Sequence, residues 1–480
     1  MTDPLWTFVE IAQATGGTCS QDGEAHGVSI DSRTVRSGDV FLAFKGDNQD
    51  GHAYVPQAIA KGAAGVIISD LVDGLPDDLP VVQVSNTRAA LVSLGDAARS
   101  RTKAKIVGVT GSVGKTGTKE ALYTALLRSG ATHASERSYN NDIGVPLTLA
   151  RMPASTDYAV LEMGMNHAGE MRALTAMARP DVAVITNIES VHAEFFDSVE
   201  AIADAKAEIF EGMTGDGIVI LNRDNAYCDY LAKAAKAHGI GRVLTFGEAK
   251  DADVRLLKSF EAEDCTAVNA QIDGELMTYR IGVPGAHWVT NSLAVLATVH
   301  ALGADLGLAG LALGEMVAPK GRGRRHWVNF RDGVVLAIDE SYNASPVSMR
   351  AAISDLGRAK GQLPDSGIPG RKIAVLGDML ELGAQSEQQH QALAEPLEQA
   401  GVDLVFTVGS ATEILNASLQ PFRRGGHAVD CDSLIPQLME QLQPGDVVMT
   451  KGSNAMGLSA VIDALMTLDD DHAPRRSAAG

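Results

Sequence analysis

The segment Gly111-Ser112-Val113-Gly114-Lys115-Thr116-Gly117 has the residue types and spacing of a phosphate-binding loop. An apolar run precedes it and a helical pattern follows it, so the glycines would lie at a strand-to-helix turn, where backbone N–H groups can face phosphate oxygens. Lys115 would neutralise the β- and γ-phosphates, and the hydroxyl of Thr116 would bind Mg²⁺. Val109 stands where the strict eight-residue pattern has Gly. The segment therefore predicts a shortened ATP-binding loop, with a plain turn as the alternative.

Three further candidates have titratable side chains, and two of them lie next to predicted buried strands. Glu162 ends the apolar run 158–161, and His192 follows the run 182–186. Because the carboxyl ends of parallel strands border the crevice where ligands bind, both side chains could reach a metal ion there. From position alone, Glu162 fits a solvated acid equally well, and a lone His is more often structural. Lys206 lies in a helical pattern, where a solvated lysine is the simpler interpretation.

One pair of polar positions and one basic run in the second half of the chain could also contact a ligand. His287 and Asn291 are four residues apart and would share one face of a helix. Arg322 lies in the basic run 320–326, which stands out in an acidic chain and indicates an anion site or a solvated hinge.

Polar loops follow predicted strands near both ends of the chain. Asp339, Tyr342 and Asn343 come after the apolar run 334–338, at a place where a crevice loop is expected. Near the N-terminus, Asp31-Ser32-Arg33 precedes the short apolar run 40–44 and by itself would be an ordinary turn.

Positioning these residues requires several domains, because 480 residues are too many for one hydrophobic core. Alternating apolar runs and helical patterns predict an α/β chain with mostly parallel sheets covered on both faces. We expect a small α/β N-terminal domain (1–85), a central P-loop domain (86–324) and a doubly wound, Rossmann-like C-terminal domain (325–468). A polar, disordered tail should follow (469–480).

Composition excludes several classes of protein. The formal charge of −20 argues against a nucleic-acid partner, which needs a basic surface, so a site for an anionic substrate must be locally basic. Four widely spaced Cys form no zinc or redox motif and favour a reducing compartment. Without a secretory signal pattern or a long apolar run, the chain is expected to be cytoplasmic with no membrane span.

Several long blocks, in order, together resemble the Mur ligases, and within that family the members that add D-alanyl-D-alanine. The blocks are 30–63 (IDSRTVRSGDVFLAFKGDNQDGHAYVPQAIAKGA), 109–120 (VTGSVGKTGTKE), 139–149 (YNNDIGVPLTL), 161–171 (LEMGMNHAGEM), 186–196 (TNIESVHAEFF), 205–210 (AKAEIF), 338–349 (IDESYNASPVSM), 376–383 (LGDMLELG) and 451–453 (KGS). Because the resemblance runs over nearly the whole chain, it is far more specific than the phosphate loop alone.

The resemblance implies a role for each matching residue. Catalytic roles fall to Lys115, Lys206 and His192. The magnesium ligands would be Thr116, Glu162, His192 and Lys206, the last as a carbamate formed with carbon dioxide. ATP handling would involve 111–117 together with His287, Asn291, Arg322 and Asp339, with Tyr342 and Asn343 lining the same cleft. The uridine-linked substrate would contact Asp31, Ser32 and Arg33 in the first domain and Asn140 and Asn141 in the second.

The reaction that the resemblance implies is ATP-dependent amide formation between UDP-N-acetylmuramoyl-tripeptide and D-alanyl-D-alanine through an acyl phosphate, with Mg²⁺ as cofactor and a monomeric enzyme. The alternatives are a different amino-acid-adding ligase, such as a MurE-type enzyme or a folylpolyglutamate synthase, and a non-catalytic nucleotide-binding regulator. Three positions depart from the family pattern: Ser138 and Trp288 replace Asn, and Asn454 replaces a basic residue.

Overall fold

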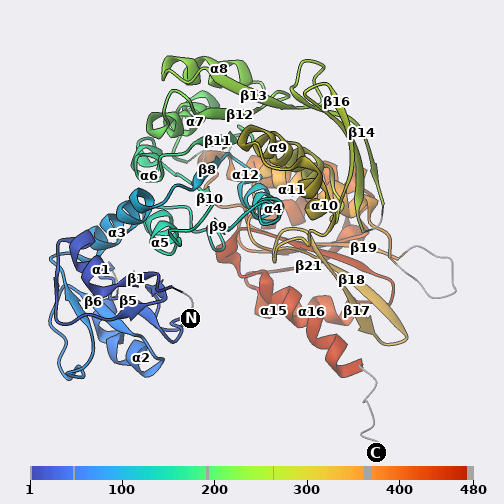
Figure 1. Ribbon diagram of the computed structural model, residues 1–480. Helices are drawn as coiled ribbons and strands as arrows, with labels where there is room; N and C mark the ends of the chain where they lie inside the picture. Colours follow the sequence, from blue (N-terminus) through green and yellow to red (C-terminus); the bar gives the residue numbers. More distant parts are fainter. Residues whose placement is uncertain (1–2, 47–48, 191–193, 263, 362–369, 473–480) are drawn as a thin grey trace, which may run out of the picture.

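The computed structural model describes residues 3–472 except 47–48, 191–193, 263 and 362–369, and for 470–472 it describes the backbone alone. In it, the strands form three α/β bodies that follow one another along the chain (Figure 1). The blue N-terminal body lies at one side, the green central body at the top, and the orange-red C-terminal body below it (Figure 1). This arrangement confirms the predicted α/β class with three bodies.

The N-terminal body has a five-stranded sheet in the order β2-β7-β6-β5-β4 and a small antiparallel pair, β1-β3. Strands β4 to β7 are mutually parallel, and β2 is antiparallel to β7. The elements are β1 Trp6–Thr7, α1 Phe8–Thr15, β2 Thr18–Cys19, β3 Glu24–Ala25, β4 Gly27–Ser29, β5 Asp39–Leu42, η1 Gly51–Tyr54, α2 Val55–Ala60, β6 Gly65–Ile68 and β7 Val81–Gln83. The loop after β4, at the carboxyl end of that strand, carries Asp31, Ser32 and Arg33.

Helix α3 (Thr87–Arg101) connects the first body with the second. Its buried residues, including Leu91 and Leu94, share one apolar cluster with Phe8 of α1 and Leu147 of the central body. The helix therefore belongs to the core of both bodies, which couples their positions more tightly than a flexible linker would.

The central body is built on a nine-stranded sheet in the order β16-β15-β14-β13-β12-β11-β8-β10-β9. Its strands are β8 Lys105–Thr110, β9 Thr132–Ala134, β10 Tyr158–Glu162, β11 Val182–Ile185, β12 Ile218–Asn222, β13 Arg242–Gly247, β14 Val254–Glu261, β15 Thr266–Ile272 and β16 Glu275–Ile281. Its helices are α4 Lys115–Leu126, α5 Gly144–Ala150, α6 Glu170–Ala178, α7 Val199–Ala207, η2 Glu208–Gly212, α8 Cys228–Ala237, α9 Ala286–Leu302 and α10 Leu306–Gly314.

Alternate residues of the central strands face opposite helical layers, as strand geometry requires. Val107 and Val109 of β8 pack with α4 and α9, whereas Ile106 packs with α6, α7 and α8. The seven neighbouring strands β9, β10, β8, β11, β12, β13 and β14 are parallel, which agrees with the prediction of a mostly parallel sheet covered on both faces.

The antiparallel meander β14-β15-β16 at the edge of this sheet was not predicted from the sequence. In β15, buried and exposed residues alternate, because one face covers α9 and the other faces solvent. Such half-buried strands lack the continuous apolar runs by which the other strands were recognised.

The C-terminal body contains a six-stranded sheet in the order β17-β18-β22-β19-β20-β21, in which only β17 is antiparallel. Its strands are β17 Arg324–Phe330, β18 Gly333–Glu340, β19 Lys372–Gly377, β20 Leu404–Val408, β21 Arg424–Ala428 and β22 Val447–Lys451. Its helices are α11 Pro346–Arg358, η3 Gly383–Gln385, α12 Ser386–Gln391, α13 Ala394–Gln399, α14 Glu413–Ser418, η4 Pro421–Arg423, α15 Cys431–Gln441, η5 Asn454–Met456 and α16 Ser459–His472.

Helix α16 corrects the predicted start of the disordered tail. It continues to His472, so residues 469–472 are helical, while 473–480 lie outside the described residues. Asp469 accepts hydrogen bonds from the backbone and side-chain N–H groups of Asn329. This contact with β17 holds the helix end against the sheet, which a polar sequence alone does not reveal.

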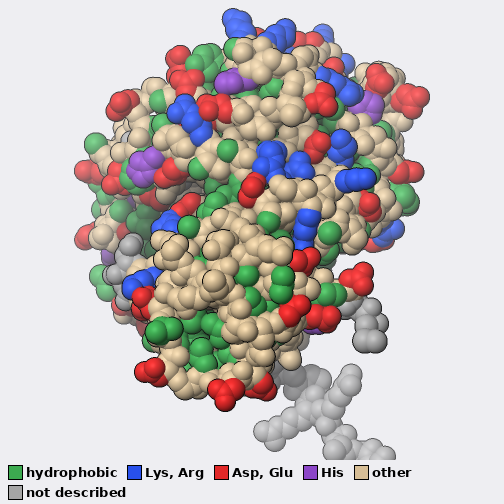
Figure 2. All heavy atoms as spheres, turned by 60° about the vertical axis from the view of Figure 1, so that its left-hand side comes forward, with side chains coloured by type: hydrophobic (Ala, Val, Ile, Leu, Met, Phe, Trp, Pro, Cys, Tyr) green, Lys and Arg blue, Asp and Glu red, His purple; other side chains and the backbone are tan. Residues whose placement is uncertain are grey.

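On the face shown in Figure 2, acidic and basic side chains are interspersed, and the described residues form no continuous basic patch there. All four cysteines are free thiols. Within the described chain, no helix combines the length and apolar character that crossing a bilayer requires.

Candidate active site

The phosphate-binding loop connects β8 to the start of α4, as predicted. Gly111 and Gly114 have φ angles of 147° and 87°, which side chains disfavour. A Cβ atom at Gly111 would lie 2.0 Å from Thr186 Oγ1, and one at Gly114 would lie 3.0 Å from Asn291 Oδ1. The loop therefore needs glycine for both its backbone conformation and its close packing.

Thr116 and Glu162 form the centre of the site. Thr116 Oγ1 donates to Glu162 Oε2 at 2.8 Å, and the two residues are 6% and 1% exposed. The other carboxylate oxygen, Oε1, accepts from Asn140 Nδ2 at 2.9 Å. Closely spaced carboxylate and hydroxyl oxygens beside a phosphate loop are the ligand chemistry that Mg²⁺ prefers. The residues present therefore fit the predicted metal.

Two lysines of the site, Lys115 and Lys206, have lowered pKa values. Burial lowers the pKa of Lys115, with nearby Glu162 opposing the effect and Arg322 reinforcing it. Burial, with repulsion from Lys115 second, lowers the pKa of Lys206 well below its ordinary value. Lys206 is 1% exposed and makes no ion pair with any described residue. The site is thus locally basic within an acidic protein, and it contains a lysine that is easily deprotonated.

Arg322, in the segment that links the central and C-terminal bodies, lies near the phosphate loop. Its Nη2 lies 3.5 Å from Ser138 Oγ, and its guanidinium lies 4.4 Å from the centre of the Tyr342 ring. Asp339, which is fully buried, accepts from the N–H of Gly321 at 2.8 Å and from Ser341 Oγ at 2.6 Å. The carboxylate of Asp339 therefore fixes the turn that presents Arg322.

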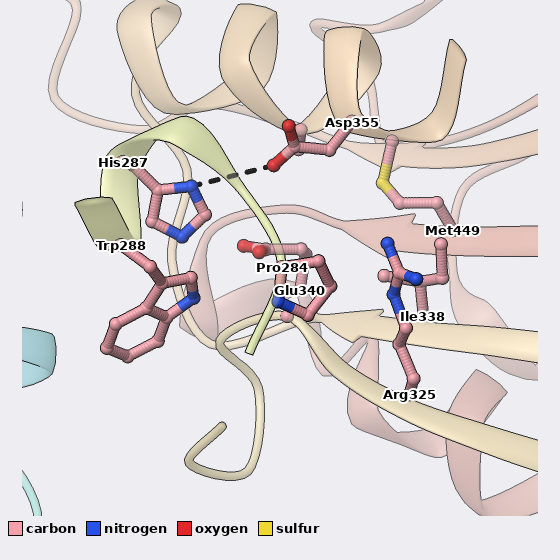
Figure 3. A pocket seen from close by; sticks show the side chains of 10 residues that line it. Pro284, His287, Trp288, Arg325, Ile338, Glu340, Asp355 and Met449 are labelled. Carbon is pink, nitrogen blue, oxygen red and sulfur yellow. Dashed lines mark ion pairs between the residues drawn. The ribbon is translucent and has the colours of Figure 1, made fainter. Parts of the chain in front are cut away.

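A pocket lies between the central and C-terminal bodies (Figure 3). His287 and Trp288 line one wall, and the imidazole Nδ1 of His287 lies 3.5 Å from the carboxylate of Asp355 on α11 (Figure 3). A Cβ atom at Gly117 would lie 3.2 Å from both Asn291 and the Trp288 ring, so this side of α9 packs directly on α4. Trp288 thus occupies the wall between the phosphate loop and the pocket.

A second contact joins the same two bodies on another side. The N–H of Glu194 donates to the carbonyl oxygen of Glu381 at 3.3 Å.

Within the C-terminal body, the carbonyl oxygen of Asn343 accepts from Lys451 Nζ at 2.8 Å, and Lys451 Nζ also bonds the carboxylate of Glu340 at 3.1 Å. Asn454, the departure from a basic residue, is exposed at the start of η5.

Of the residues predicted to contact the uridine-linked substrate, Asn140 lies beside the phosphate loop, and the others have contacts elsewhere. Asp31 binds the guanidinium of the exposed Arg33, and Ser32 Oγ donates to Gln57 at 2.7 Å. Asn141 Oδ1 accepts from the N–H of Gly144 at the start of α5, whereas Asn140 faces Glu162. The first group lies in the N-terminal body, as a substrate spanning two bodies would require.

The structure also places at the site two serines that were not predicted to act there, although Ser138 was noted as a departure from the family pattern, and it leaves one predicted residue undescribed. Ser138 Oγ lies 3.2 Å from Thr116 Oγ1, and Ser135 Oγ accepts the N–H of Glu162 at 3.1 Å. Their signal in the sequence is weak, because serines in a loop are common. His192, the third predicted magnesium ligand, lies outside the described residues.

Comparison with known proteins identifies the family. Three family models match: "Mur ligase family, catalytic domain" over residues 24–99, "Mur ligase middle domain" over 109–299, and "Mur ligase, glutamate ligase domain" over 323–454. A Rickettsia prowazekii protein named UDP-N-acetylmuramoyl-tripeptide–D-alanyl-D-alanine ligase is 32% identical, and the match covers 96% of this chain and 99% of that protein. The chain belongs to the Mur ligase family.

Solved structures of other Mur ligases share the whole fold. MurF from Acinetobacter baumannii has a TM-score of 0.81 at 30% identity, covering 96% of this chain and 99% of that one. The MurF ligase from Thermotoga maritima, solved in complex with ADP, has a TM-score of 0.74 at 28% identity, covering 93% and 98%. The predicted family and the three-body architecture of this Mur ligase are therefore confirmed, while the roles of individual site residues stay predictions.

Proposed function

We propose that this Mur ligase joins D-alanyl-D-alanine to UDP-N-acetylmuramoyl-tripeptide in peptidoglycan synthesis, with conversion of ATP to ADP and phosphate. The names of relatives that match over nearly the whole chain support this reaction. The structural observation that carries the proposal is the buried Thr116–Glu162 oxygen pair beside Lys115, because it suits ATP with its metal ion. Use of ATP and of a UDP-linked substrate favours a cytoplasmic reaction.

The chemistry requires activation of a carboxylate, which is a poor electrophile. Transfer of the γ-phosphoryl group to the peptide carboxylate forms an acyl phosphate, and the amine of D-alanyl-D-alanine then attacks its carbonyl carbon. Phosphate leaves from the tetrahedral intermediate, and the amine loses its proton. Lys115 and Arg322 offset the repulsion between the two anionic reactants and the charge that develops during transfer. Mg²⁺, when bound, neutralises phosphate charge.

Each body would supply one part of the site. The N-terminal body, with Asp31, Ser32 and Arg33, is proposed to hold the uridine end of the substrate, and Asn140 and Asn141 its muramoyl part. The central body would bind ATP through 111–117, and the C-terminal body would bring the acceptor amine. Because one chain contains all three bodies, we propose a monomeric enzyme with boundaries near 85, 324 and 468.

Lys206 is proposed to act as a carbamate. A deprotonated ε-amine can attack carbon dioxide, form an N–C bond and release one proton, which converts a potential cation into an anion. Burial and the neighbouring Lys115 favour the required neutral amine. An anionic group here would balance Lys115 and Arg322 and could bind Mg²⁺ through oxygen, as Thr116 and Glu162 do.

The reaction is tested by measuring phosphate release from ATP with UDP-N-acetylmuramoyl-tripeptide and a series of amine acceptors. We expect release to require both the tripeptide and D-alanyl-D-alanine, with free amino acids and L-alanyl-L-alanine inactive. The matching product must appear by mass spectrometry. Turnover with a free amino acid and none with D-alanyl-D-alanine would assign the chain to a different ligase step.

The metal role is tested with Glu162→Gln, which keeps an oxygen acceptor for Thr116 and removes the negative charge. We expect the Mg²⁺ concentration for half-maximal activity to rise at least about tenfold, because one charged ligand is lost. Glu170→Gln is the matched control, since this exposed acid bonds His167 away from the loop. An unchanged Mg²⁺ requirement in Glu162→Gln would contradict the assignment.

A further inference from the structure

Lys119 is a fully buried cation that the proposed reaction does not use. It lies in α4 one helical turn after Lys115 and is 0% exposed. Its Nζ donates to the carbonyl oxygens of Ser135 at 2.8 Å and Arg137 at 3.0 Å, and it contacts the carboxylate of Glu120. Lysine is almost never fully buried unless it is paired, and here two of its three partners, Ser135 and Arg137, belong to the loop after β9. Lys119 therefore ties the helix of the phosphate loop to that neighbouring segment.

The segment held by Lys119 covers the proposed metal-binding oxygens. We call residues 135–141 the covering loop. From this loop, Ser138 Oγ lies 3.2 Å from Thr116 Oγ1, and Asn140 Nδ2 donates to Glu162 Oε1 at 2.9 Å. Ser135 Oγ accepts the backbone N–H of Glu162 at 3.1 Å. Three side chains of the covering loop thus orient the two residues that are proposed to bind Mg²⁺.

One residue of the covering loop, Arg137, has an unfavourable backbone conformation. Arg137 has a φ of 50°, a left-handed conformation that costs energy for a residue with a side chain. Its side chain is exposed, whereas its carbonyl oxygen is one of the acceptors of Lys119 Nζ. The bond from Lys119 therefore holds the loop at the residue where its conformation is least favourable.

We propose that Lys119 is a positioning residue that sets the geometry of the Mg²⁺ ligands through the covering loop. The inference rests on the proposed function, because it assumes that Thr116 and Glu162 bind the metal that accompanies ATP. Lys119 touches neither residue through its ammonium group. It acts by holding Ser135 and Arg137, so that Ser138 and Asn140 remain on the hydroxyl and the carboxylate.

The test measures equilibrium binding of ATP to the full-length protein, both in EDTA and across a Mg²⁺ titration. In Lys119→Met, which keeps an unbranched apolar stem and removes the ammonium group, we expect the Mg²⁺ concentration for half-maximal tightening to rise by about 10- to 100-fold, the range for lost outer-shell partners. ATP affinity in EDTA should stay at the wild-type value, because the phosphate loop and Lys115 are intact. Lys119→Arg, which keeps charge and donors, should recover part of the loss.

Substitutions of Arg137 test the same proposal without changing the buried Lys119. Arg137→Val makes the left-handed conformation more costly and should raise the Mg²⁺ requirement in the same direction, whereas Arg137→Gly should leave it unchanged. Because position 137 is exposed, these variants test the proposal even if Lys119→Met fails to fold. Lys372→Met is the matched control, since Lys372 also bonds a carbonyl oxygen, that of Gly357 in the C-terminal body.

The outcomes separate this inference from the proposed function. If ATP binding to the wild-type protein does not respond to Mg²⁺, the metal role of Thr116 and Glu162 is wrong. If the wild type responds and neither Lys119→Met nor Arg137→Val changes the Mg²⁺ requirement, the positioning role is overturned. Equal weakening of ATP binding with and without Mg²⁺ in Lys119→Met would also overturn it, because that result indicates a general structural role.

Discussion

Replacing Lys115 by alanine is expected to abolish ATP-dependent ligation, with a loss of at least about 10²–10³-fold in kcat, the range for removing one preorganised group that stabilises transition-state charge. Lys115 starts α4 beside the Thr116–Glu162 pair, and its Nζ bonds the carbonyl oxygen of Gly111 at 2.6 Å. Its ammonium group is therefore held where the transferred phosphoryl group would lie. The measurement is phosphate release together with product formation by mass spectrometry.

A loss of activity caused by misfolding of Lys115→Ala must be distinguished from a loss of catalysis. Among the described residues, Lys115 bonds only carbonyl oxygens of its own loop, Gly111 and Ser112, so Lys115→Ala should keep the wild-type circular dichroism spectrum and thermal midpoint. Lys105→Ala is the matched control, because Lys105 lies at the exposed start of β8 and bonds Asp181. Turnover near the wild-type rate in a folded Lys115→Ala protein would remove the phosphate-loop assignment.

Replacing Lys206 by alanine is the second change with a large expected effect. If the carbamate is needed, activity should fall by a similar factor of about 10²–10³, because an anion that balances Lys115 and Arg322 is lost. The space left by the side chain should admit a small carboxylic acid, so acetate or propionate is expected to restore part of the activity. Lys236→Ala, on the helix α8, is the control and should show neither the loss nor the rescue.

The pH dependence of the same site follows from the lowered pKa of Lys206. Carbamylation needs the neutral amine, so activity should fall as pH decreases through the lowered pKa, and bicarbonate should restore activity only above it. In CO₂-free buffer the unmodified amine is buried at a cost, because the unfolded chain binds a proton that the folded state resists. Lys206→Met should then have an equal or higher thermal midpoint while remaining inactive.

A decrease in thermal midpoint together with full activity would contradict both statements about Lys206. It would mean that the amine contributes to folding and that no carbamate is required. Loss of activity without rescue by any small acid would leave the lysine important for catalysis and would contradict the carbamate itself.

The phosphate loop and the family were predictable from the sequence because their signals are local. Glycines at positive φ, the Lys115-Thr116 pair and the strand before them lie within a dozen residues, and the ordered blocks carry the resemblance to Mur ligases. Fully buried strands were recognised for the same reason, since each is a continuous apolar run. The meander β14-β15-β16 was missed because its strands are covered on one face only.

The tertiary structure supplied the contacts between the residues around the loop, whose roles the family resemblance only implied. Thr116 bonds Glu162 from 46 positions away, and Arg322 approaches Ser138 from 184 positions away. These contacts depend on the order of strands in the sheet and on the path of the linker, and residue periodicity contains neither. The same reason hid Lys119, which looks like any helix lysine until the covering loop closes over it. The sequence by itself determined an ATP-using Mur ligase, and the packing of β8, β10 and the covering loop decided the geometry of its proposed metal site.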